Sequence, residues 1–80
     1  MTNLVRRPDR LPRAGQLVHI SPAAGVYGAG AAWWHVITAE PALTDGMCYL
    51  TAGPLDPNDN DGRARVFFCR IDGLLVQDVR

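Results

Sequence analysis

Two histidines and two cysteines are the side chains in this sequence with the most evident chemistry. The ligand types of a zinc site built from two Cys and two His are all present, as His19, His35, Cys48 and Cys69. Compact zinc modules bring such ligands in close pairs, as in C-x-x-C or H-x-x-x-H, whereas these four are expected on four different strands. The spacing therefore predicts no metal site. It favours buried thiols that form a disulfide only under oxidation.

Two loops resemble ion-binding or phosphate-binding loops in composition. Segment 56–62, DPNDNDG, has oxygen ligands on alternate residues as a calcium loop does, but Pro57 stands where the first Asp belongs and Phe68 where a bidentate Glu belongs. Segment 25–30, GVYGAG, is glycine-rich, but no helical pattern follows to supply the helix N-terminus that binds phosphate. We therefore expect neither a calcium site nor a cofactor.

Acid–base and nucleophilic catalysis have little support in the sequence. Glu40 is the only glutamate, no acidic pair has a defined spacing, and neither histidine belongs to a recognisable nucleophile motif. We expect a protein that is not an enzyme. An enzymatic function would require a pocket in which His19 or His35 meets a carboxylate.

The N-terminal arm, residues 1–14, is the one strongly basic stretch. Its cations are Arg6, Arg7, Arg10 and Arg13. Guanidinium groups bind phosphate through forked donors, and an arginine-rich arm beside exposed aromatic rings is typical of proteins that bind single-stranded nucleic acid. The composition of the whole chain argues against a dedicated nucleic-acid binder, because its formal net charge is zero.

Length and composition place these groups in one small domain. The chain has 80 residues, 48% of them apolar, with no room for a second domain or a large enzymatic cleft. A core of this size contributes only about 3–5 kcal/mol of stability, so a bound partner or a second copy is expected to matter. No secretory signal or membrane-spanning stretch fits the sequence, which predicts a cytoplasmic protein.

Turn signals divide the chain into short runs rich in β-branched and aromatic residues. Asp-Gly pairs, which tolerate the positive φ of tight hairpins, stand at 45–46, 61–62 and 72–73. No segment has a helical stripe over three turns. We expect an all-β fold, a small five-stranded, partly open barrel of residues 15–80 behind the extended arm, with strands at about 16–21, 32–39, 47–52, 64–71 and 74–79.

Turn positions also predict which side chains share a face. A hairpin centred near 58–59 places Cys48 opposite Cys69 and Leu50 opposite Phe67. A two-residue turn at 72–73 places Cys69 opposite Val76 on the last strand. The inner face that results also contains Val18, Ile20, Trp34 and Val36.

The opposite face of the sheet should be polar, yet it gathers rings and cations. Its residues are Trp33, His35, Tyr49, Phe68 and Arg70. A bulge that shifts the register by one residue would turn these side chains inward, and the arm could cover them. A second copy of the chain could also pack there, because contiguous exposed apolar area often marks an interface.

The run Gly15-Gln-Leu-Val-His-Ile followed by Trp33-Trp34 resembles the middle of SH3-like barrels, which often have G-D-x-V-x-I and a Trp pair. The resemblance covers about 15–36. The same stretch is loosely similar to KOW-type modules, with hydrophobic residues and glycines in comparable order. Gln16 replaces the usual acidic residue, and the ALYDY and PSNY stretches that recognise proline-rich peptides are absent. The resemblance implies a barrel, and such barrels contact nucleic acid, peptides or other subunits.

Together these patterns predict a non-enzymatic binding module that contacts nucleic acid. Its expected contacts combine the arm with the aromatic face, and they are Arg6, Arg7, Arg10, Arg13, Trp33, His35, Tyr49, Phe68 and Arg70. The alternative is a protein-interaction module or a homodimer that uses the same aromatic face.

Overall fold

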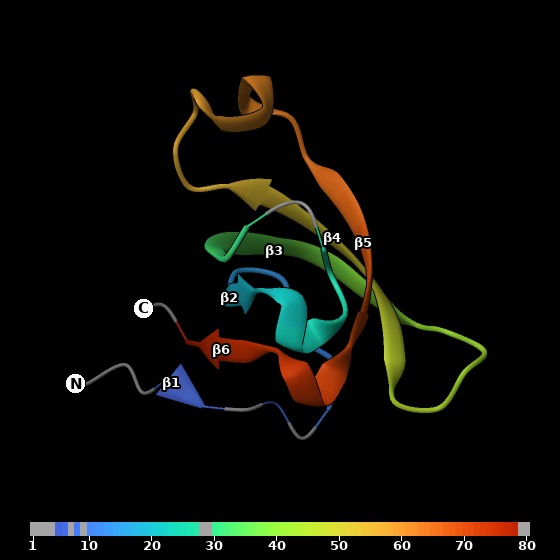
Figure 1. Ribbon diagram of the computed structural model, residues 1–80. Helices are drawn as coiled ribbons and strands as arrows, with labels where there is room; N and C mark the ends of the chain where they lie inside the picture. Colours follow the sequence, from blue (N-terminus) through green and yellow to red (C-terminus); the bar gives the residue numbers. More distant parts are fainter. Residues whose placement is uncertain (1–4, 7, 9, 28–29, 79–80) are drawn as a thin grey trace.

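The chain folds into one antiparallel β-sheet, which confirms the predicted all-β class (Figure 1). The computed structural model describes residues 5–6, 8, 10–27 and 30–78. The strands of the described residues are β1 (Val5–Arg6), β2 (Leu17–Ile20), β3 (Ala32–Pro41), β4 (Met47–Pro54), β5 (Arg65–Arg70) and β6 (Leu75–Gln77). Three short 3-10 helices accompany them: η1 (Pro22–Ala24), η2 (Asp59–Gly62) and η3 (Ile71–Gly73).

The sheet is curved but does not close into a barrel. Its strand order is β1-β6-β2-β3-β4-β5, so β1 and β5 are its two edges. All five predicted strands are present, within one or two residues at most of their ends. The arm adds to these five strands a short sixth one, because Val5–Arg6 pairs with Val76 and Gln77 of β6.

A bulge in the longest strand bends the sheet. Val36 pairs with Ala52 and Thr38 with Thr51, which leaves Ile37 of β3 without a partner on β4. An extra residue of this kind increases the local twist and bends its strand. After the inward side chain of Val36, the next one is therefore that of Ala39, three residues along. The strand thus keeps the same face toward solvent on both sides of the bulge.

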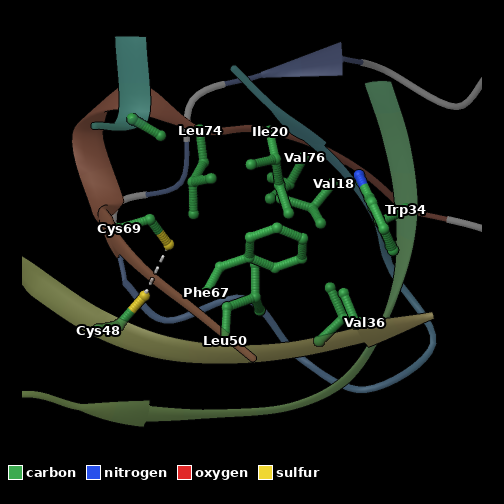
Figure 2. Packing of buried hydrophobic residues seen from close by; sticks show 12 residues of the cluster. Val18, Ile20, Trp34, Val36, Cys48, Leu50, Phe67, Cys69, Leu74 and Val76 are labelled. Carbon is green, nitrogen blue, oxygen red and sulfur yellow. Dashed lines mark hydrogen bonds between the residues drawn. The ribbon is translucent and has the colours of Figure 1, made fainter. Parts of the chain in front are cut away.

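The inner face of the curved sheet holds the hydrophobic core (Figure 2). The predicted inner residues are all buried, and the predicted pairs of Cys48 with Cys69 and Leu50 with Phe67 are both confirmed. Phe67 packs edge-on against Trp34, with ring centroids 5.0 Å apart at 72°. The guanidinium of Arg65, an exposed residue, lies over the Phe67 ring with its Cζ 4.9 Å from the ring centroid.

The predicted two-residue hairpin at 72–73 is wrong. Ile71–Gly73 forms η3, and the chain then leaves β5 and pairs with β2, where Val76 lies opposite Val18. Gly73 allows this path because its backbone lies against η1: a Cβ at this position would be 2.1 Å from the Ala23 carbonyl oxygen. Close packing between η1 and η3 therefore replaces a hairpin turn, and β5 is left without β6 beside it.

Gln16 ties the arm to the end of the last strand. Its side chain is 8% exposed, and its Oε1 accepts a hydrogen bond of 2.7 Å from the Arg13 backbone N–H. Its Nε2 donates to Asp78. An amide can accept on one side and donate on the other, which a carboxylate cannot. The Gln that departs from the SH3-like pattern thus has a structural use in this chain.

Candidate binding surface

Tyr49 and Phe68 form an exposed aromatic pair on the outer face of the sheet. They lie directly opposite each other on β4 and β5, with ring centroids 5.2 Å apart at 42°. Tyr49 is 49% exposed and Phe68 48% exposed, and Val66, two residues along β5, is 65% exposed. These three residues, named the edge patch below, form apolar surface on the last two strands of the sheet. The prediction that Tyr49 and Phe68 point away from the core is confirmed.

Trp33 and His35 lie on the same outer face but form a separate group. Trp33 is half-buried and contacts the His19 ring edge-on at 5.2 Å. The imidazole of His35 covers Gly53 of β4, where a Cβ would be 2.3 Å from its Nε2. Gly53 is four positions from Tyr49 along β4, about 13 Å in a strand. The single aromatic face expected from the sequence is therefore divided into two groups.

The arginines predicted to bind phosphate are spread over the molecule. Arg70 is exposed on β5, opposite Met47 and two residues from Phe68. Arg10 and Arg13 are exposed beside the β3 bulge, where they line a shallow groove with Ile37. Arg6 is in β1, at the other end of the strand order, and Arg7 lies outside the described residues. The structure thus brings Arg70 to the edge patch and leaves the described arm arginines elsewhere.

The outward side of β5 is a strand edge. The Ile71 N–H donates to the Gly46 carbonyl oxygen at 2.9 Å, which fixes the alternation of the antiparallel ladder between β4 and β5. Because hydrogen-bonded residues alternate along an antiparallel strand, the backbone N–H and C=O groups of Phe67 and Cys69 face β4. Those of Val66, Phe68 and Arg70 face away from it. Within the described part of the chain, no other strand pairs with this side of β5.

The free edge of β5 is the feature that sequence reasoning missed. The hairpin expected at 72–73 would have placed the last strand beside β5 and covered this edge. The predicted contact residues do not include Val66, although it alternates with Phe67 and so belongs to the outer face. The sequence signal for Val66 is its position two residues from Phe68, but only the strand order shows that both border an edge with which no other described strand pairs.

A groove near η1 and η3 is the candidate place for acid–base chemistry, because a histidine and a carboxylate both line it. Its lining includes His19, Arg70 and Asp72. Within the described residues, the His19 ring contacts Trp33 edge-on. Among the same residues, no three His, Cys, Asp or Glu side chains gather as metal ligands.

Cys48 and Cys69 face each other in the core with their Sγ atoms 3.7 Å apart (Figure 2). The hydrogen bond from the Cys69 thiol lowers the pKa of Cys48, although burial opposes this change. The same hydrogen bond, together with burial, raises the pKa of Cys69. Directly opposed residues in such a ladder lie within disulfide range. The two thiols therefore lie at disulfide-bonding range, and Cys48 is the one whose pKa the pair lowers.

Comparison with protein-family models, with curated proteins and with solved structures gave no match to this chain. Among the described residues, none lies in a helix of the length and apolar character needed to cross a membrane.

Proposed function

We propose that this chain is a non-enzymatic protein-interaction module that binds an extended segment of its partner along the free edge of β5. The observation that carries the proposal is the coincidence of two features on one strand. No strand of the described residues pairs with the outward backbone groups of β5, and the side chains of the same residues, Val66 and Phe68, are exposed apolar groups.

An added strand would satisfy both features at once. Its backbone would hydrogen-bond to the outward N–H and C=O groups of β5, and its alternate side chains would pack beside the edge patch. Soluble proteins usually protect an edge with proline, a bulge or lysine. Strand β5, RVFFCR, has none of these devices between its terminal arginines, and no bulge interrupts its pairing with β4.

Single-stranded nucleic acid is the second candidate partner, favoured by Arg70 beside the exposed rings of Tyr49 and Phe68. Bases stack on such rings while a guanidinium holds phosphate. The positions of the loop carboxylates and of the arm arginines favour a protein partner instead. The loop from β4 to β5 carries Asp56, Asp59 and Asp61, all exposed, and the described arm arginines are away from the edge patch. Both features weaken the attraction for a phosphate backbone at this surface.

The SH3-like resemblance of residues 15–36 is part of the same proposal. The resemblance is supported by the all-β sheet, which curves around one core without closing. The resemblance adds no partner of its own, because such barrels serve many binding functions.

Selection from a random linear peptide library displayed on phage tests the protein-binding proposal. Dilute immobilised protein is expected to enrich peptides with alternating apolar residues that bind it at about micromolar Kd, the range of modest strand-addition interfaces. Phe68→Ala is expected to weaken the best peptide about tenfold, because one buried aromatic contact is lost. Leu43→Ala is the matched control, since Leu43 is fully exposed in the loop between β3 and β4.

A labelled oligothymidylate measured in parallel separates the two candidate partners. Enriched peptides that bind the Phe68→Ala variant as well as the wild type would contradict binding at the edge patch. Tight oligothymidylate binding that weakens with salt and with Arg70→Ala, in the absence of peptide binding, would replace the protein partner with nucleic acid.

A further inference from the structure

We propose that the strand which adds to β5 is the β5 strand of a second copy, so that two chains form a continuous sheet around a twofold axis at Phe68. This inference rests on the proposed function, because it names the partner of the same edge. It goes further by fixing the register and the symmetry of the contact.

The ladder between β4 and β5 limits the registers available. Outward backbone groups belong to Val66, Phe68 and Arg70, so an antiparallel partner must hydrogen-bond to these residues. Arg70 is also the N-cap of η3, so its carbonyl oxygen accepts a bond within that turn and has its second lone pair left for a partner. With the axis at Phe68, each of the three faces an outward residue of the other copy: Phe68 faces the partner's Phe68, and Val66 faces the partner's Arg70. With the axis at Phe67, Arg70 would face the partner's Ala64, beyond the end of its strand β5.

The exposed rings also suit this register. Tyr49 and Phe68 already lie opposite each other at 5.2 Å within one chain. Placing Phe68 beside the partner's Phe68 extends this pair into a row of four rings across the interface, from Tyr49 to the partner's Tyr49. Aromatic pairs on one sheet face are among the favourable cross-strand contacts.

The charges of β5 are compatible with self-pairing. No two arginines face each other in this register, because Arg70 lies opposite an apolar Val66 of the other copy. Its guanidinium is diagonal to the partner's Phe68, within reach of a long side chain and suited to the negative face of the ring. The formal net charge of zero adds no long-range repulsion between copies. A twofold contact also covers both exposed edges at once, whereas a foreign peptide covers one.

Sedimentation equilibrium of the full chain tests the inference through a substitution of one backbone donor. Because the Val66 N–H faces away from β4, Val66→Pro removes a bond to the second copy and none within the sheet. Wild type at about 10 μM to about 1 mM is expected to shift from the chain mass of 8.7 kDa toward twice that value. Val66→Pro is expected to weaken the dimer at least about tenfold, while Val66→Thr, which keeps the donor, dimerises as the wild type does.

The possible outcomes separate this inference from the proposed function. A wild type that stays monomeric throughout overturns the second copy as partner, while peptide binding that is lost in Val66→Pro would leave the proposed function standing. A dimer that Val66→Pro leaves intact places the contact elsewhere and contradicts the inference. If Val66→Pro loses its β-sheet circular dichroism, Phe68→Asp replaces it, since a charge at the axis faces its own copy and is expected to give a folded monomer.

Discussion

The Phe67→Ala variant is expected to lose most of its folded population at 25 °C, while Phe68→Ala, one residue along, stays folded. Phe67 is 4% exposed and packs against Trp34 in the core. Truncating a buried Phe to Ala costs about 3–5 kcal/mol, through the lost transfer free energy and the cavity left behind. A domain of this size has about that much stability in total. Circular dichroism at 25 °C measures the folded fraction of both variants, and urea denaturation measures the free energy of unfolding of the wild type and of Phe68→Ala.

Phe68 is the matched control because it has the same chemistry on the opposite face of the same strand. Its ring is 48% exposed and contacts Tyr49 at the surface, so its truncation is expected to cost about 1 kcal/mol or less. Equal destabilisation by the two substitutions would mean that the two faces of β5 are not divided between core and surface. That result would remove the basis for a contact surface at Phe68.

Gly73→Ala is expected to be the most damaging glycine-to-alanine change among the described residues. The added Cβ would lie 2.1 Å from the Ala23 carbonyl oxygen and 2.6 Å from the Ala24 Cα, and both are backbone atoms that cannot rotate away. Forcing η1 and η3 apart is expected to cost about 3 kcal/mol, at the upper end of the range for overpacked sites. In a domain of this size that lowers Tm by about 15 °C, which thermal denaturation followed by circular dichroism measures.

Gly46→Ala separates lack of space from backbone strain. Gly46 has φ of +78° with no atom within 4 Å of the added Cβ, so its cost comes from the left-handed conformation alone, about 1–2 kcal/mol. Gly73 has the opposite situation, an ordinary φ with no space. A Tm for Gly73→Ala equal to or above that of Gly46→Ala would show that η1 and η3 do not pack as closely as described.

The alternation of inward and outward side chains along each strand was enough to predict much of the fold. The inward positions of Trp34, Leu50 and Phe67 follow from the period of two in a strand, and the pairing of Cys48 with Cys69 follows from the loop between their strands. The outward direction of Tyr49 and Phe68 comes from the same argument. These properties depend on neighbours along the chain or across one hairpin, which the sequence contains.

The strand order could not be predicted in this way. Asp72-Gly73 has the composition of a tight hairpin turn, but the chain gains more by packing η3 on η1 and pairing β6 with β2. Those contacts join segments about 50 residues apart, for which hairpin rules hold no information. The division of the aromatic face has a similar origin: Trp33 and Tyr49 share a face, but the offset between β3 and β4 separates them.

Residue-specific amide hydrogen exchange by NMR in dilute solution tests most directly whether the outward side of β5 is a free edge. The amides of Phe67 and Cys69 bond to β4 and are expected to exchange slowly, while those of Val66, Phe68 and Arg70 exchange far faster. Raising the protein concentration or adding a selected peptide should slow the second set alone. Slow exchange of both sets in the dilute monomer would mean that the chain already covers this edge, and it would contradict the proposed binding surface.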